Sequence, residues 1–234
     1  MSIDTSIIVP IYNTAEMIKD SVNQITNTMD PLRMNYEILL RDDGSTDGSR
    51  EVLKQVAGEY PEVKYFYNPS NKGLGSTLRK LLRDARGDKI VYCDCDLPFG
   101  VHIIPVLLKR LKDNDIVVAS RYRGALNRTP FARKACSRFY YFLCRLLFNI
   151  PIADIGSGSV AMRSRILDEV HLKANGFDIH AEFYVKASKK EFRIKEMPVE
   201  FDTPKQGSFH IWEHGPDALM RTFKLYFESL KNAC

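Results

Sequence analysis

Short apolar runs alternate with longer segments of helical periodicity through the first half of the chain, and this alternation constrains the fold more than any other feature. The apolar runs are continuous, which is typical of strands buried on both faces. Such a succession indicates a single α/β domain whose mostly parallel central sheet is flanked by helices. Pro10 should end the first strand, and Thr14 should cap the first helix. We expect strands at residues 6–9, 36–40, 63–67, 89–93 and 116–120, and helices at residues 15–29, 49–59, 74–85 and 103–111.

The length and composition are those of one globular domain. The chain has 234 residues and a mild formal net charge of +5, and no stretch rich in Gly, Ser or Pro marks a linker. No apolar run reaches the ~20 residues that span a bilayer, and no N-terminal segment has the pattern of a signal peptide. The five cysteines lack a metal-binding spacing, so we expect free thiols in a reducing cytoplasm.

Two carboxylates follow directly on the expected strand at residues 89–93. Asp94 and Asp96 are separated only by Cys95, and the strand delivers them to the sheet edge where ligands bind in open α/β folds. Carboxylates held this close repel each other and favour a cation between them. Mg²⁺ and Mn²⁺ prefer oxygen ligands and bridge carboxylates to phosphates. A solvated acidic turn would explain the same three residues without a ligand.

Two further loops follow the first two expected strands at the same edge of the sheet. In residues 9–13, Tyr12 could lie against a planar base. In residues 41–49, Asp43 could accept hydrogen bonds from a base or a ribose, and the glycines permit tight turns. An Asx turn followed by a helix cap would explain the second loop equally well.

Together these segments resemble the inverting family 2 glycosyltransferases of the GT-A fold. The resemblance rests on V-P-I-Y-N at 9–13, R-D-D-G-S-T-D-G-S at 41–49, N-K-G-L-G at 71–75 and D-C-D at 94–96. Three later motifs are similar to those of dolichol-phosphate mannosyl- and glucosyltransferases: V-A-S-R-Y at 118–122, D-I-G-S-G at 154–158, and G-F-D at 176–178 with A-E at 181–182. The similarity extends over about residues 7–210.

The resemblance implies roles for particular residues on the donor side. The nucleoside would be contacted by Pro10, Tyr12, Arg41 and Asp43. The diphosphate and a Mg²⁺ or Mn²⁺ ion would lie at residues 94–96, with Asp96 as the direct metal ligand and Asp94 beside it. Thr14 stands where the subgroup has Glu, and Pro98 where it has Gln.

The resemblance also implies an acceptor side. Arg121 would meet the acceptor or donor phosphate, and Arg133 and Ser137 would hold the phosphate of a lipid. Asp96, Arg121 and Arg133 would then carry the reaction. Lys205 replaces an Arg of the late family motif and would add positive charge at the diphosphate.

The expected reaction is inverting transfer of a hexose from GDP-mannose or UDP-glucose to dolichyl or polyprenyl phosphate. A phosphate monoester is mostly dianionic at neutral pH and needs no general base. A sugar hydroxyl acceptor, as in polysaccharide or glycolipid synthesis, would need one, for which Asp178 and Glu182 are candidates. A non-catalytic nucleotide-binding subunit and a nucleotidyltransferase remain alternatives.

Residues 128–148 interleave basic and aromatic side chains, which suits a helix on an anionic membrane. A core helix or a nucleic-acid surface has the same composition, but we expect no nucleic-acid partner. We expect a catalytic domain over residues 1–210, with this interface helix near 130–148, and a C-terminal amphipathic helix within 211–234. The protein would be peripheral on the cytoplasmic face of a membrane, with or without a membrane subunit.

Overall fold

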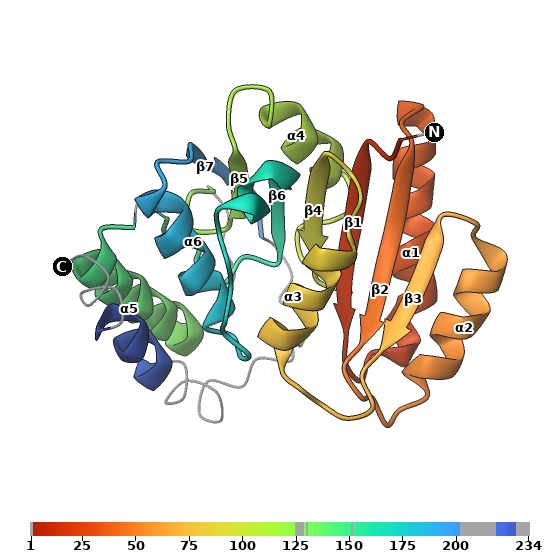
Figure 1. Cartoon of the computed structure of the whole chain (residues 1–234), viewed down its shortest axis with the longest axis horizontal. Coiled ribbons are helices and arrows are strands. Elements are labelled where there is room, and N and C mark those ends of the chain that lie inside the picture. Colours follow the sequence, from red (N-terminus) through yellow and green to blue (C-terminus); the bar gives the residue numbers. More distant parts are fainter. Residues whose placement is uncertain (1, 125–128, 130, 151, 202–218, 228–234) are drawn as a thin grey trace.

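A seven-stranded sheet runs through the part of the chain that the computed structural model describes, which is residues 2–124, 129, 131–150, 152–201 and 219–227 (Figure 1). The strands are β1 Thr5–Ile11, β2 Tyr36–Asp42, β3 Val63–Tyr67, β4 Lys89–Cys93, β5 Ile116–Ser120, β6 Ser159–Arg163 and β7 Ile194–Pro198. Their order across the sheet is β3-β2-β1-β4-β6-β5-β7. Only β6 is antiparallel to its neighbours, so the predicted mostly parallel sheet is confirmed.

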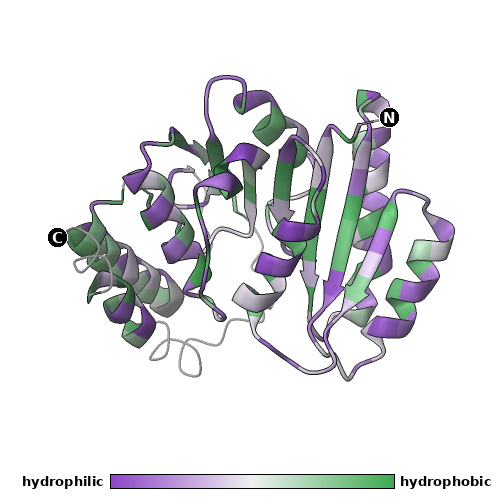
Figure 2. Cartoon of the chain, in the orientation of Figure 1, coloured by the Kyte–Doolittle hydropathy of each residue, from purple (hydrophilic) through white to green (hydrophobic). Residues whose placement is uncertain are grey.

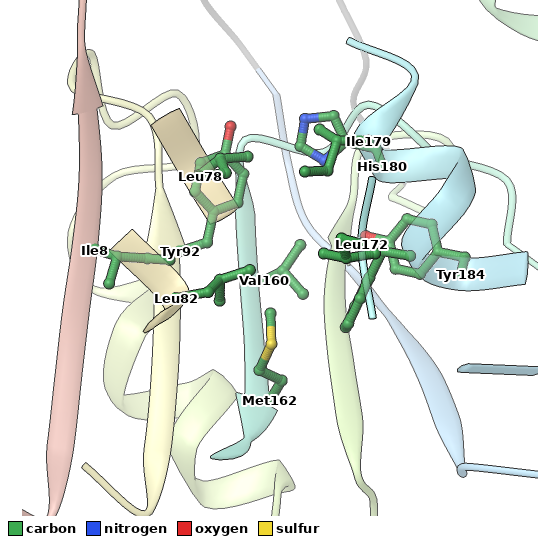
Figure 3. Close-up of a pocket in the computed structure, with 11 residues that line it drawn as sticks. Ile8, Leu78, Leu82, Tyr92, Val160, Met162, Leu172, Ile179, His180 and Tyr184 are labelled. Carbon is green, nitrogen blue, oxygen red and sulfur yellow. The ribbon is translucent and has the colours of Figure 1, made fainter. Parts of the chain in front are cut away.

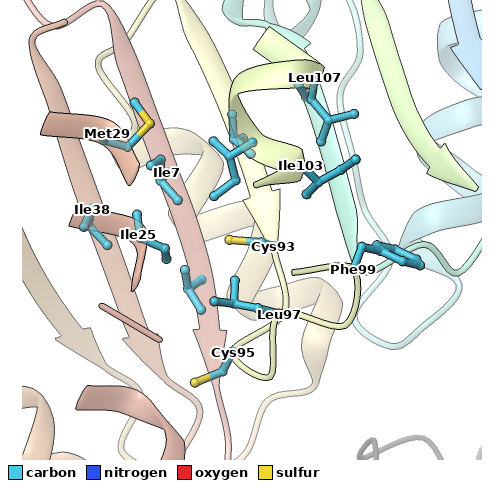
Figure 4. Close-up of a cluster of buried hydrophobic side chains, with 14 of the residues drawn as sticks. Ile7, Ile25, Met29, Ile38, Cys93, Cys95, Leu97, Phe99, Ile103 and Leu107 are labelled. Carbon is cyan, nitrogen blue, oxygen red and sulfur yellow. The ribbon is translucent and has the colours of Figure 1, made fainter. Parts of the chain in front are cut away.

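Helices cover both faces of the sheet because the strands bury side chains in both directions. Ile7 belongs to the cluster beneath α1, α2 and α4, and Ile8 belongs to the opposite cluster beneath α3 and α6. Figure 4 shows the first cluster, and Figure 2 shows hydrophobic residues along the strands and alternating hydrophobic and hydrophilic residues along the helices. The helices are α1 Ala15–Met29, α2 Ser49–Glu59, α3 Leu74–Asp84, α4 Ile103–Arg110, α5 Phe131–Phe148 and α6 Ile179–Lys189, with 3₁₀ turns at Asp30–Leu32 and Ser164–Asp168.

In the first unit one predicted strand end is wrong, and the predicted N-cap residue makes no capping bond with its side chain. Pro10 does not end the first strand: it pairs in register with Arg41, and β1 continues to Ile11. The pairing of β1 with β4 ends at Ile8, so the missing N–H of Pro10 costs no bond on that side. Thr14 makes no side-chain capping bond to α1; a side chain from the next loop takes that place.

The reversed strand β6 brings a late segment to the ligand-binding edge. The carboxyl ends of β1, β2, β4 and β5 lie at one edge of the sheet, and the amino end of β6 lies there too. Residues 154–158 therefore reach the loop that follows β4. Both β6 and β7 are strands that the sequence reasoning did not identify.

The predicted basic segment forms α5, and residues 219–227 form a further helix beside it (Figure 1). The Tyr140 hydroxyl and the Thr222 hydroxyl share a 2.8 Å hydrogen bond, and the Phe148 and Tyr226 rings meet edge to face. Within the described ranges, no helix combines the length and the apolar character needed to cross a membrane.

Candidate functional site

The loops after β1 and β2 are tied to each other at the carboxyl edge of the sheet. Asn13 accepts a hydrogen bond from the Thr46 backbone N–H at 2.9 Å. The Asp47 carboxylate accepts from the backbone N–H groups of Ala15 at 2.9 Å and Ser49 at 3.0 Å, so it caps the starts of both α1 and α2. Burial would raise the pKa of Asp47, but these hydrogen bonds outweigh it and the pKa is lowered. The helix-cap interpretation of the loop at residues 41–49 is therefore confirmed at Asp47.

Asp43 is buried between this loop and the one that follows β3. Its carboxylate accepts hydrogen bonds from the Asn68 side-chain amide at 2.7 Å and from the backbone N–H groups of Lys72 and Gly73, both at 2.9 Å. Gly44 has φ +77°, and a Cβ there would lie 2.6 Å from the Asn71 backbone nitrogen. The N-K-G-L-G motif thus closes onto Asp43 and fixes its orientation at the site.

The other expected nucleoside residues differ in what they can reach. Tyr12 is 42% exposed at the end of β1, and Pro10 is half-buried beside it. Arg41 is engaged elsewhere. Its guanidinium donates to Asp84, the last residue of α3, at 2.6 Å, and lies 4.7 Å from the Phe66 ring centroid. This ion pair holds the guanidinium against the last residue of α3, and a contact of Arg41 with the nucleoside stays a prediction.

The two carboxylates of the D-C-D motif lie half-buried on a tight turn after β4. The Asp94 backbone N–H donates to the Gly158 carbonyl at 2.9 Å. The Asp94 carbonyl accepts from the Leu97 backbone N–H at 3.0 Å, and Leu97 has φ +44°. The Tyr92 hydroxyl donates to Asp94 Oδ1. A Cβ at Gly158 would overlap Asp94 Oδ2, so any other residue there would have to displace the Asp94 carboxylate.

Cys95 points away from the two acids. Its side chain is buried in the cluster beneath α1, with Sγ 3.9 Å from Ser21 Oγ (Figure 4). Burial raises the pKa of the Cys95 thiol to about 11. The thiol is therefore a core group, and any contact of Cys95 with a diphosphate is limited to its backbone.

Arg121 and Asp154 form a buried ion pair next to this turn. The guanidinium donates from Nε and Nη2 to the two Asp154 oxygens at 2.9 and 3.0 Å, and from Nη2 to the Gly156 carbonyl at 2.9 Å. Burial would lower the pKa of Arg121, but Asp154, with a contribution from Asp94, more than offsets it and the pKa is raised. Arg121 is thus a permanent, rigidly held cation within electrostatic reach of Asp94.

The donor set at this edge fits a divalent cation of the Mg²⁺ type. Asp94 and Asp96 offer two hard carboxylates, and among the residues placed by the structure no group of three or more His, Cys, Asp or Glu side chains could hold a metal. Mg²⁺ commonly takes one or two carboxylates and completes its shell with substrate phosphates and water. The residues present therefore suit a cation that binds together with a phosphorylated ligand.

Apart from Arg121, the expected acceptor residues lie on α5, and part of this set falls outside what can be described. Ser137 is half-buried on α5, and Arg133 lies one turn before it, although its side chain is outside the described residues, as is all of Lys205. Glu182, a candidate base, is buried, and its carboxylate accepts the backbone N–H groups of Lys173 and Ala174 at 2.8–3.0 Å. Those bonds make Glu182 a structural anchor rather than a base.

The family model described as "Glycosyl transferase family 2" matches residues 6–171. The chain belongs to glycosyl transferase family 2. Among curated relatives of this family-2 chain, a dolichol-phosphate mannosyltransferase of Pyrococcus furiosus is 32% identical over 86% of this chain. Glycosyltransferase AglD of Haloferax volcanii is 25% identical over the same share. The chain spans 57% and 33% of the lengths of these two relatives.

Solved structures share the fold of this family-2 domain. A mannosyl-3-phosphoglycerate synthase from Rubrobacter xylanophilus superposes with a TM-score of 0.79 at 15% identity, covering 98% of this chain and 75% of that one. A glucosyl-3-phosphoglycerate synthase from Mycobacterium tuberculosis, in complex with Mn²⁺, UDP and glucosyl-3-phosphoglycerate, has a TM-score of 0.72 at 17% identity, covering 95% of this chain and 79% of that one. These similarities identify the fold as GT-A, as predicted.

Three residues of the family-2 site were not assigned a role from the sequence. Asp154 and Gly158 lie in a motif that carried the resemblance, but only the antiparallel course of β6 brings them to Arg121 and Asp94. Tyr92 precedes Asp94 by two positions, so both side chains lie on the same face of the extended chain. That spacing of two was the available signal for Tyr92.

Proposed function

We propose that the chain is a hexosyltransferase that moves a sugar from a nucleotide-diphosphate donor to the phosphate of a dolichyl or polyprenyl lipid, with inversion. One observation carries the proposal: a carboxylate pair suited to a divalent cation and the held cation Arg121 meet at the carboxyl edge of a family-2 fold. The dolichol-phosphate mannosyltransferase that is 32% identical supports the lipid acceptor.

The donor would lie across the ends of β1, β2 and β4. In this proposal Tyr12 and Pro10 flank the nucleoside, and the fixed Asp43 carboxylate accepts from it. Asp96 and Asp94 would hold Mg²⁺ or Mn²⁺ on the diphosphate. When bound, that cation would neutralise the charge that develops on the leaving group. The Mycobacterium tuberculosis synthase that shares this fold was solved with Mn²⁺ and UDP.

A phosphate acceptor suits the surroundings better than a hydroxyl acceptor. A hydroxyl would need a base, and of the two candidates Glu182 is already engaged by backbone N–H groups, which leaves only Asp178. A phosphate needs cations that hold it without removing its charge. Arg121 would supply one of them in an orientation that Asp154 fixes. Arg133 and Ser137 on α5 would supply the others, with Lys205 at the diphosphate.

The lipid requires a surface where its chain can stay in a membrane, and we propose the outer face of α5 and of the helix at 219–227. Neither helix contains an acidic residue, and basic residues interleave with the apolar ones. Large apolar side chains there are exposed, among them Phe131 at 86% and Leu146 at 72%. Such a face suits the anionic cytoplasmic leaflet, where the protein would be peripheral or would adjoin a membrane subunit.

The test is product analysis with radiolabelled donors. The purified chain is incubated with GDP-mannose or UDP-glucose, Mn²⁺ or Mg²⁺, and dolichyl or polyprenyl phosphate in liposomes. We expect a labelled lipid that mild acid cleaves, and we expect Asp96→Ala to remove it. A labelled product that resists mild acid and forms only with a sugar acceptor would favour a hydroxyl glycosyltransferase. No transfer with any pair of substrates would refute the proposal.

A further inference from the structure

Tyr92 lines a small apolar cavity, and its hydroxyl reaches the candidate metal-binding turn. The cavity has a volume of about 30 Å³ and lies between β4, α3 and α6. In Figure 3, Ile8 and Leu82 flank Tyr92 on one side, and His180 and Tyr184 face it from α6. The volume is that of one or two water molecules.

The Tyr92 ring is held in one position by this packing. It is 4% exposed, and the His180 ring centroid lies 5.5 Å from its own. Its hydroxyl leaves the cavity toward the turn and donates to Asp94 Oδ1. An ordinary tyrosine hydroxyl is protonated at neutral pH, so it serves as the donor in this bond.

The other oxygen of Asp94 is confined from the opposite side. Gly158 lies so close to Oδ2 that a side chain there would overlap it, and the backbone N–H of Asp94 is bonded to the Gly158 carbonyl. The carboxylate is therefore fixed by a hydroxyl on Oδ1 and by packing at Oδ2. A carboxylate that is already fixed before the cation binds loses little rotational freedom when it coordinates the cation.

We propose that Tyr92 is a positioning residue that orients the Asp94 carboxylate for the divalent cation of the donor site. The inference rests on the proposed function, because it requires a cation at Asp94 and Asp96. It adds a residue that touches neither substrate nor metal and acts only through Asp94. Hydrogen bonds from such outer partners typically contribute a factor of 10 to 100 in metal affinity.

The chain offers a matched control in the same cavity. Tyr184 also lines it and is fully buried, and its hydroxyl has no hydrogen-bond partner within the described ranges. Tyr92→Phe and Tyr184→Phe each remove one hydroxyl from one cavity and keep the ring. Only the first removes a bond to Asp94, so a packing effect would appear in both variants and a positioning effect in one.

The experiment measures Mn²⁺ binding by electron paramagnetic resonance, with GDP and then UDP at saturation. We expect Y92F to weaken Mn²⁺ binding by about tenfold or more, and Y184F to stay within about twofold of the unaltered chain. Circular dichroism checks that both fold. Transfer activity of Y92F should recover at high Mn²⁺ concentration, since the ligand is misoriented but present.

The outcomes separate the inference from the proposed function. If Asp96→Ala abolishes Mn²⁺ binding while Y92F binds like the unaltered chain, Tyr92 does not position Asp94 and the inference fails alone. Equal weakening in Y92F and Y184F would also overturn it. If the unaltered chain binds no Mn²⁺, or Asp96→Ala binds it normally, the proposed metal site fails and the inference fails with it.

Discussion

Acid should destabilise this protein through one histidine on α6. His180 packs against Tyr92 in the apolar cavity, and burial lowers its pKa from 6.5 to about 4. The unfolded chain therefore binds a proton at His180 before the folded chain does. The free energy of unfolding should be unaffected by His180 above pH 6.5 and should fall as the pH drops from 6.5 to about 4.

The size of the effect follows from the two pKa values. Each unit of difference corresponds to about 1.4 kcal/mol, so the full loss through His180 approaches roughly 3 kcal/mol. Between pH 7.5 and pH 5 the linkage relation gives a loss of about 2 kcal/mol. For a chain of this length that corresponds to a fall of about 4 to 8 °C in melting temperature.

The measurement is urea unfolding at pH 7.5, 6.5, 5.5 and 5, followed by circular dichroism. His180→Phe keeps a ring of similar size against Tyr92 and removes the titrating group. Between pH 7.5 and pH 5, the free energy of unfolding of H180F should therefore decrease by about 2 kcal/mol less than that of the unaltered chain. His171→Gln is the control, because His171 is exposed. Parallel pH profiles for H180F and the unaltered chain would refute the reasoning.

Three further changes test the site and the surface. Asp154→Asn removes the buried carboxylate that pairs with Arg121 and should cost about 3 kcal/mol of stability; a melting temperature within about 2 °C of the unaltered chain would contradict this. Gly158→Ala places a methyl group against Asp94 Oδ2 and should weaken Mn²⁺ binding about tenfold by paramagnetic resonance, so an unchanged affinity would show that this contact is dispensable. Leu146→Ser removes an exposed apolar side chain from α5 and should weaken sedimentation with anionic liposomes by about tenfold; equal sedimentation would exclude this face.

The first half of the fold could be predicted because its information is local. Most strands from β1 to β5 contain a short apolar run, and the helices between them have clear periodicity, so most bounds agree within one or two residues. The prediction at Pro10 was wrong because the effect of this proline depends on where β4 stops pairing with β1, and β4 lies about 80 positions further along the sequence. The same holds for Thr14, whose capping role passes to Asp47 from another loop.

The candidate site was predictable in outline and not in detail for the same reason. A motif predicts that a residue lies near a strand end, but not which way its side chain turns. Arg41 and Cys95 both lie at the expected edge, yet Asp84 draws the first toward α3 and the apolar cluster beneath α1 takes up the second. The partner of each side chain, Asp84 for Arg41 and Ser21 for Cys95, lies more than 40 positions away in the sequence.

The single reversed strand explains how the site is completed. Had β6 run parallel to β4, its amino end would lie at the opposite edge of the sheet, and Gly158 could not reach Asp94. Because β6 is antiparallel, the segment before it returns along the ligand-binding edge and contributes Asp154 as well, which orients Arg121 at the end of β5. One change of strand direction therefore supplies both the packing that confines a metal-binding carboxylate and the counter-charge that fixes the neighbouring cation, and this couples the two halves of the proposed site.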